Sequence, residues 1–251
     1  MRNEWTRYLA SAARALPILV LVAGAPASAA IMVISERDGD ADGLETNGTF
    51  VFDTVPSNSS TDLANGILPT LVGALNNSSS LANLTNGPAQ LALANNISES
   101  TVANNGASPR FIIDLGSVKA VKEFNTYSAH SGERAAQKYT LYVATGAEPG
   151  FNAAPVTAVD PTTVGWTLLA DVDTTPLGVT GNAQHGVSVR DSTGKLGDYR
   201  YFMMAVLPVG TLATARTNYG EADVVAVPEP SVALIGLLGL PALARRRVHS
   251  A

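Results

Sequence analysis

The chain contains a series of short apolar or alternating segments that are separated by turn residues, with no helix-length amphipathic segment between them. Residues 111–116 form a compact apolar run that ends at a glycine, and residues 139–145 alternate so that Tyr139, Leu141 and Val143 share one face. This pattern is typical of antiparallel sheets packed face to face, so we predict an all-β antiparallel β-sandwich. The other strand candidates are residues 166–170, 201–206 and 223–227.

The part of the chain before these strands has a different composition. Asn, Ser, Gly and Ala dominate from about residue 38 to residue 107, and these residue types favour turns and loops. We therefore expect short strands joined by long loops there. The predicted division is an Asn/Ser/Gly-rich part at 30–79 and the sandwich at 80–227.

The N-terminus has the three regions of an export signal. Three arginines precede the apolar run at residues 16–25, and the small residues Ala27 and Ala29 follow it. The run is ten residues long, whereas a transmembrane helix needs about 20. We predict a signal peptide at residues 1–29 that is cleaved after Ala29.

The C-terminus carries a second apolar segment. Residues 231–244 would form a helix of about 21 Å, shorter than the ~30 Å of the hydrocarbon core. Arginines behind this segment resist translocation, and the prolines before it prevent helix and keep the chain extended. We predict that residues 228–251 hold the chain transiently in the inner membrane. The motif residues are Val227, Pro228, Glu229, Pro230 and Ser231, followed by Arg245, Arg246 and Arg247.

Charge and cysteine content exclude several classes of protein. The formal charge of the whole chain is -5, but six of its 16 basic and two of its 21 acidic residues lie in the two ends, so residues 31–227 carry about -9. An acidic body has no basic surface for nucleic acid and is suited to divalent cations. The absence of cysteine excludes disulfides, zinc fingers and thiol nucleophiles.

Catalytic motifs are missing from the sequence. It contains no Gly-x-Ser-x-Gly elbow, phosphate-binding loop, dinucleotide fingerprint or His-Glu-x-x-His motif. Only His130 and His185 lie in the mature body, and we expect both on surface loops. We therefore predict no catalytic residues and a protein that is not an enzyme.

The C-terminal motif, apolar segment and arginine cluster resemble the PEP-CTERM sorting signal of Gram-negative bacteria that make extracellular polysaccharide. The resemblance covers residues 227–251. It implies that an exosortase recognises the tail and processes it near Pro-Glu-Pro. The chain would then be an exosortase substrate located in the cell envelope, at the cell surface or outside the cell.

The order of the strand motifs resembles a second family. The segments "DLG" at 114–116, "YTLYVATG" at 139–146, "WTLLA" at 166–170 and the closing acidic strand at 219–224 follow the pattern of discoidin or coagulation-factor C-type modules. This resemblance spans about residues 80–227 and implies a galactose-binding-like jelly roll. The chain departs from the family in having Phe111 where a tryptophan is usual and in lacking a disulfide.

The same resemblance implies a calcium site between a loop and the last strand. Carried over to this sequence, its ligands would be Asn86 with neighbouring carbonyls, and Glu221. The alternative is that Asn86 and Gly87 only form a turn and that Glu221 is an exposed strand residue. The acidic run at 38–45 matches the start of an EF-hand loop but lacks the final glutamate, so we interpret it as a solvated turn. No other cofactor is predicted.

Two functions fit these observations. The first is a non-catalytic module whose loops bind polysaccharide or another envelope component, with aromatic side chains that stack on sugar rings. Its candidate ligand-binding residues are Tyr127, Trp166 and Tyr219, each of which has a core role as the alternative. The second is an exported glycan-active enzyme on a jelly-roll scaffold, which would need two close carboxyl groups in a cleft.

Overall fold

A computed structural model describes residues 29–39, 52–56, 61–75, 80–87, 101–102, 108–178, 182–209 and 217–228. These residues form nine strands, and every pairing between the strands is antiparallel. The strands are β1 (Ile31–Gly39), β2 (Thr70–Val72), β3 (Thr101–Val102), β4 (Arg110–Ser131), β5 (Lys138–Ala144), β6 (Thr167–Asp173), β7 (Asn182–Asp191), β8 (Gly197–Val206) and β9 (Asn218–Ala226). The prediction of an antiparallel all-β fold is confirmed.

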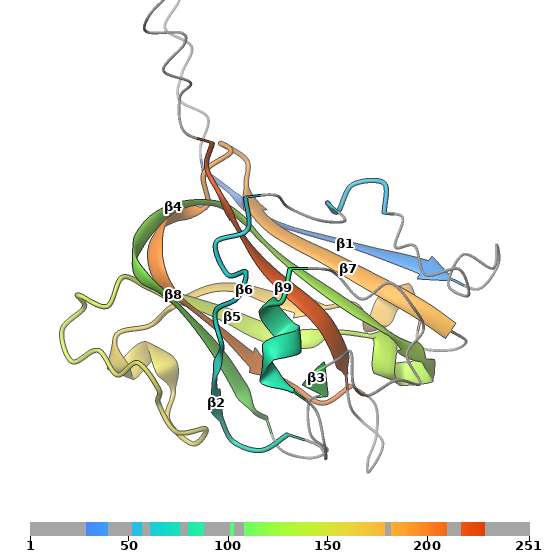
Figure 1. Cartoon of the computed structure of the whole chain (residues 1–251), viewed down its shortest axis with the longest axis horizontal. Coiled ribbons are helices and arrows are strands. Elements are labelled where there is room, and N and C mark those ends of the chain that lie inside the picture. Colours follow the sequence, from blue (N-terminus) through green and yellow to red (C-terminus); the bar gives the residue numbers. More distant parts are fainter. Residues whose placement is uncertain are drawn as a thin grey trace, which may run out of the picture.

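Strand β4 joins the two layers of the fold. Its first half pairs with β2 and β8, and its second half pairs with β7 and β9. The pairing with β8 shifts register between Asp114 and Lys119, and Gly116 in this bend has a φ of 76°, which favours glycine. Figure 1 shows the resulting curve of β4. One layer is therefore β2-β4-β8-β5-β6, and the other is β1-β7-β4-β9-β3.

The main core fills the space between these layers. Inward residues alternate along each strand, as in Tyr139, Leu141 and Val143 of β5, all of which are fully buried. Phe124 of the second layer stacks on Phe202 of the first, with ring centroids 5.5 Å apart. Helical structure in the described residues is limited to the 3-10 turns η3 (Leu81–Thr85), η5 (Gly132–Ala135), η6 (Pro161–Val164) and η7 (Thr175–Leu177).

The five predicted strand segments correspond to β4, β5, β6, β8 and β9, but the structure extends this set. Strand β1 pairs with β7 along its whole length, and β2 pairs with the start of β4. Both β1 and β2 lie within residues 30–79. Strands on both sides of residue 80 therefore share one sheet.

Several predicted features lie outside the described residues. These are the signal segment up to Ser28 with its predicted helix, the acidic residues 40–45, and the C-terminal tail from Glu229 with its short hydrophobic helix. Within the described ranges, no helix has the length and apolar character that would cross a bilayer.

Candidate metal centre

Three carboxylates meet on the outer face of the second layer. Strand β9 alternates, so Ala222 and Val224 enter the core while Glu221 and Asp223 point to the opposite face. The segment around Asp62 runs beside β9, with Leu63 donating its N–H to the Val224 carbonyl at 2.8 Å. One oxygen each of Asp62, Glu221 and Asp223 can be chosen so that all three lie within 4.8 Å of one another.

Each carboxylate uses one oxygen for the fold and leaves the other without a partner. Asp62 Oδ1 accepts from the N–H groups of Ala64 and Val224, both at 2.8 Å. Glu221 Oε1 accepts from the Gly87 N–H at 3.1 Å. The second oxygen of Asp62 and of Glu221, and Oδ1 of Asp223, are buried and have no hydrogen-bond partner. Buried acceptors without a donor, on three carboxylates that lie this close together, form a set of ligands suited to a hard cation.

The electrostatics of the cluster agree with this geometry. Burial raises the pKa of Glu221 to about 9, and repulsion from Asp223 and Asp62 adds to this effect. Burial likewise raises the pKa of Asp223 to about 8, with repulsion from Asp62 as the next contribution, and burial also raises the pKa of Asp62. Without a cation, the folded protein therefore holds protons here at neutral pH. A divalent cation can replace those protons.

Asn125 extends the polar surface next to the carboxylates. It lies directly opposite Asp223 in the β4–β9 pairing, is fully buried, and both atoms of its amide lack a partner. Residues that are directly opposite on one face of a sheet have Cβ atoms about 5 Å apart. The amide oxygen of Asn125 is therefore a further candidate oxygen for an ion at this site.

The two predicted ligands differ in their place at this cluster. Glu221 is one of the three carboxylates, and the loop at Asn86 and Gly87 lies against it. Asn86 caps the C-terminus of η3, its backbone N–H points to Glu221, and its side chain is exposed. Asp223 and Asp62 were not predicted from the sequence. Period-two alternation next to Glu221 is the signal that could have identified Asp223, whereas Asp62 has no such local signal because only tertiary pairing brings it to β9.

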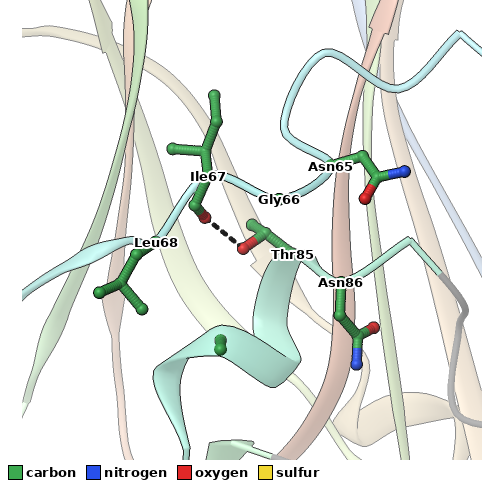
Figure 2. Close-up of a pocket in the computed structure, with 7 residues that line it drawn as sticks. Asn65, Gly66, Ile67, Leu68, Thr85 and Asn86 are labelled. Carbon is green, nitrogen blue, oxygen red and sulfur yellow. Dashed lines mark hydrogen bonds between the residues drawn. The ribbon is translucent and has the colours of Figure 1, made fainter.

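A pocket of about 250 Å³ lies beside this centre. Two exposed amide side chains, Asn65 and Asn86, line it together with Ile67 and Leu68 (Figure 2). Thr85 donates its hydroxyl to the Ile67 carbonyl, which ties η3 to the loop that forms the other wall. The remaining lining residues are Gly66 and Ala82.

The three aromatic residues predicted to bind ligand are core residues, which contradicts that prediction. Tyr127 and Tyr219 have no exposed surface, and Trp166 is 3% exposed. Trp166 donates its indole N–H to the Asn152 carbonyl at 2.8 Å and packs against Phe151. No ring face of these residues is open to a sugar. Burying a large aromatic ring in the core is more favourable than leaving it in water, so such rings are mostly found inside the fold.

The two histidines are also buried, so their expected position on surface loops is wrong. His185 lies on β7 with no exposed surface, and its Nδ1 is 2.7 Å from the Thr174 hydroxyl. Burial lowers the pKa of His185 to about 4, so it is neutral at physiological pH. His130 on β4 is 7% exposed.

Comparisons with known proteins find similarity in structure only. No family model matches the chain, and no curated protein is significantly similar in sequence. A fucose-binding module of Streptococcus pneumoniae has 13% identity and a TM-score of 0.42, covering 71% of this chain and 100% of that one. The lectin domain of lectinolysin complexed with Lewis B antigen has 13% identity and a TM-score of 0.41, covering 68% and 99%.

A third similar structure is the family 32 carbohydrate-binding module from C. perfringens NanJ in complex with galactose. It has 10% identity and a TM-score of 0.41, covering 65% of this chain and 96% of that one. At these values the likeness does not by itself assign a ligand to this chain.

Proposed function

We propose that this protein is an exported, non-catalytic carbohydrate-binding module with a galactose-binding-like fold, which binds a polysaccharide or another glycan of the cell envelope or matrix. The observation that carries the proposal is the open pocket between Asn65 and Asn86 beside the carboxylate cluster. Few polar groups on a rigid, partly apolar wall are the usual composition of a small-molecule site.

The chemistry of the pocket suits one sugar ring. Each amide offers an N–H₂ donor and a carbonyl acceptor, which together match neighbouring hydroxyl groups. Ile67 and Leu68 offer apolar surface for the C–H face of the ring, and Leu68 is 68% exposed. The pocket therefore combines both types of contact that a saccharide requires.

We further propose that Asp62, Glu221 and Asp223 hold a calcium ion, with the Asn125 amide as an additional oxygen donor. The unpartnered buried oxygens described above support this assignment. Bound calcium would neutralise the three carboxylates. The segment at 62–65 and the loop at 86–87 would then be fixed on β9, and both segments contribute a wall of the pocket.

The alternative function is a glycan-active enzyme that uses the same carboxylates for catalysis. The structure favours this role less than ion binding. Their separation below 4.8 Å is close enough for a catalytic pair, but Glu221 and Asp223 have no exposed surface. They also do not line the pocket. A glycosidic bond has to reach both carboxyl groups, so this burial favours ion binding. Release of reducing sugar from a bound polysaccharide would reverse that conclusion.

The binding experiment compares glycan-array signals of the wild-type chain with and without a calcium chelator. Asn65→Ala combined with Asn86→Ala should reduce binding at least tenfold without lowering thermal stability. Ser117→Ala, an exposed polar residue on the bend of β4, is the matched control. If the double variant binds as well as the wild type, the pocket is not the glycan site. If no glycan binds at all, the proposed function is wrong.

Sorting through the C-terminal tail by an exosortase is proposed from the motif at residues 227–231 and the arginines at 245–247. Mass spectrometry of the protein from its native host tests this proposal. We expect released protein to end near the Pro-Glu-Pro motif. Released protein that still contains residues 245–251 would contradict processing.

A further inference from the structure

Both ends of the described body lie at the same end of the fold. Ala30 exchanges hydrogen bonds with Ser192, which follows β7, at 3.2 and 3.0 Å. Val227, just after β9, donates its N–H to the carbonyl of Ala120 at 3.0 Å, and Leu196 donates to the adjacent Val121. Figure 1 shows the start of β1 and the end of β9 together at the top of the molecule. We call this region, with the bend of β4 and the β7–β8 connection, the terminal end.

The terminal end exposes apolar side chains. Ile31, Met32 and Val33 at the start of β1 are 41%, 37% and 41% exposed, and Val118 in the bend of β4 is 49% exposed. The other exposed large apolar residues of the described ranges are Leu68, Val156, Leu168, Leu177 and Leu207. Leu177 lies at the opposite end, since it precedes the start of β7.

Basic residues lie at the same end of the fold as these apolar residues. Lys119, Lys122, Arg190 and Lys195 all belong to the terminal end, which therefore holds four of the ten basic residues of a body that carries about -9. The side chains of Lys122 and Lys195 are 44% and 46% exposed, and they pair with Glu123 and Asp198.

The acidic residues at this end are fewer than the basic ones. Glu123 and Asp191 are buried, at 3% and 6% exposed, and the 57% exposed side chain of Asp198 pairs with Lys195. At the edge of the bend, the side chain of Asp114 is 42% exposed but is neutralised by its pair with Arg200. The remaining four basic and three acidic residues give the terminal end a net charge of about +1, in contrast to the acidic body. Exposed apolar side chains with a basic rim match the interface of a bilayer that contains anionic lipid.

The segment between β9 and the C-terminal apolar run is short, which limits how far the terminal end can lie from that run. Only three residues separate Val227 from Ser231, where the apolar segment begins. A fully extended chain covers at most about 3.6 Å per residue, so Val227 lies within about 14 Å of the start of that segment. Whenever the apolar segment is inserted in the bilayer, the terminal end must lie next to the lipid headgroups.

We infer that the terminal end is a membrane-docking surface, with Val118 and the start of β1 at the lipid interface and the lysines on anionic headgroups. This inference rests on the proposed membrane-directed tail and adds the surface that contacts the lipid. Docking would orient the body with the ends of β7 and β9 next to the bilayer and their starts away from it. The start of β7 would then be held about 30 Å above the bilayer, at ~3.3 Å per residue.

The absence of cysteine makes a direct test possible, because a single introduced cysteine can be labelled without background. Two full-length variants, Val118→Cys and Leu177→Cys, are labelled with a fluorophore and reconstituted into vesicles of phosphatidylethanolamine and phosphatidylglycerol. A lipid with a headgroup nitroxide serves as quencher. We expect quenching at position 118 to exceed that at position 177 at least threefold.

Charge reversal separates docking from simple tethering by the tail. Lys119→Glu with Lys195→Glu should reduce quenching at position 118 at least twofold and shift the label toward water. Lys138→Glu is the matched control, because Lys138 pairs with Asp173 as Lys195 pairs with Asp198 but lies at the opposite end. Circular dichroism and thermal melting of each variant verify that the fold is intact.

Three results would overturn the inference. Equal quenching at both positions would show that the body is not oriented. Quenching at position 118 that is insensitive to charge reversal would show a tether without docking. Concentration-dependent dimers that protect position 118 without vesicles would assign the surface to a second copy of the chain. Failure of the full chain to float with vesicles would overturn the tail proposal as well, whereas glycan binding is unaffected by any of these results.

Discussion

The backbone N–H of Gly87 donates to the carboxylate of Glu221 at 3.1 Å, across 134 residues of sequence. This bond connects the loop after η3 to the outer face of β9, where Asp223 and Asp62 complete the carboxylate cluster. The loop that lines the pocket and the candidate ion site are therefore one structural unit. Ion binding or substitution at the ion site should therefore change the affinity of the pocket for its ligand.

Calcium should stabilise the protein, and Glu221→Gln should remove this effect. At a calcium concentration of 100 times Kd, binding to the folded state contributes about 2.7 kcal/mol, which for a domain of this size raises Tm by about 5–10 °C. Glu221→Gln removes one ligand and also the free-energy cost of protonating a buried carboxyl whose pKa is raised. Its calcium-free form should therefore melt higher than wild type, with no further rise on adding calcium. Differential scanning calorimetry measures both.

Glu148→Gln is the control for this substitution. Glu148 accepts hydrogen bonds from Thr145 and Gly146 in an exposed turn away from the cluster. Its variant should keep the full calcium response. A calcium response that persists in Glu221→Gln, or is absent from wild type, would contradict the assigned metal centre.

Calcium-free protein should lose stability as pH rises. The pKa of Glu221, about 9, and that of Asp223, about 8, are raised above the ordinary carboxyl values of 4.5 and 3.8. The folded state therefore binds more protons than the unfolded state between about pH 4 and pH 9. Stability from these groups is complete below the unfolded pKa values and decreases as pH rises through the folded ones.

Urea unfolding in the presence of a chelator at pH 5, 6.5 and 8 measures this dependence. The free energy of unfolding should decrease as pH rises, by at most about 1.4 kcal/mol per pH unit for each proton that the folded state retains. Saturating calcium should flatten this dependence, because the ion takes the place of the protons. Stability that increases with pH in the chelated protein would show that the carboxylates are already ionised in the calcium-free fold.

Among the basic residues of the described body, Arg110 should be the one whose substitution lowers the free energy of unfolding most. Its guanidinium is buried and donates to four carbonyls of one loop, those of Pro155, Val156, Thr157 and Val159. Arg110→Ala leaves these acceptors without their donor and should cost about 3 kcal/mol. Arg110→Lys should recover little, because a single ammonium cannot reproduce the planar set of donors.

Arg200→Ala provides the comparison, since Arg200 forms a bidentate pair with Asp114 at the surface. Its effect on unfolding free energy should be much smaller, because solvent screens exposed ion pairs. Hydrogen exchange should also increase at residues 155–159 in Arg110→Ala alone. Equal effects of the two substitutions would contradict the role of Arg110 in holding the loop.

Trp166 should affect stability and leave the glycan affinity unchanged. It is buried beside Phe151 and Tyr201, so Trp166→Ala should cost about 3–5 kcal/mol, and Trp166→Phe clearly less. Glycan Kd of the folded Trp166→Phe variant should equal that of wild type. A weakened Kd with unchanged stability would restore the stacking role that its burial contradicts.

The strands that sequence alone identified are those with regular patterns. Strand β5 alternates and β8 is a continuous apolar run, so the period-two spacing or the apolar length was sufficient. Strand β7 contains Gln184, His185 and Gly186, which have low strand propensity, and its position depends on β1 and β4 on either side. Such a strand is determined by its neighbours more than by its own residues.

Sequence by itself determined the fold class, the charge of the body and the absence of disulfides. These properties depend on composition, on local periodicity or on a motif. Only the tertiary structure decided that Asp62 joins Glu221 and Asp223, that Tyr127, Trp166 and Tyr219 are core residues, and that both ends of the body lie together. Each of these properties depends on which strands become neighbours, and long-range pairing through the bent strand β4 sets that arrangement.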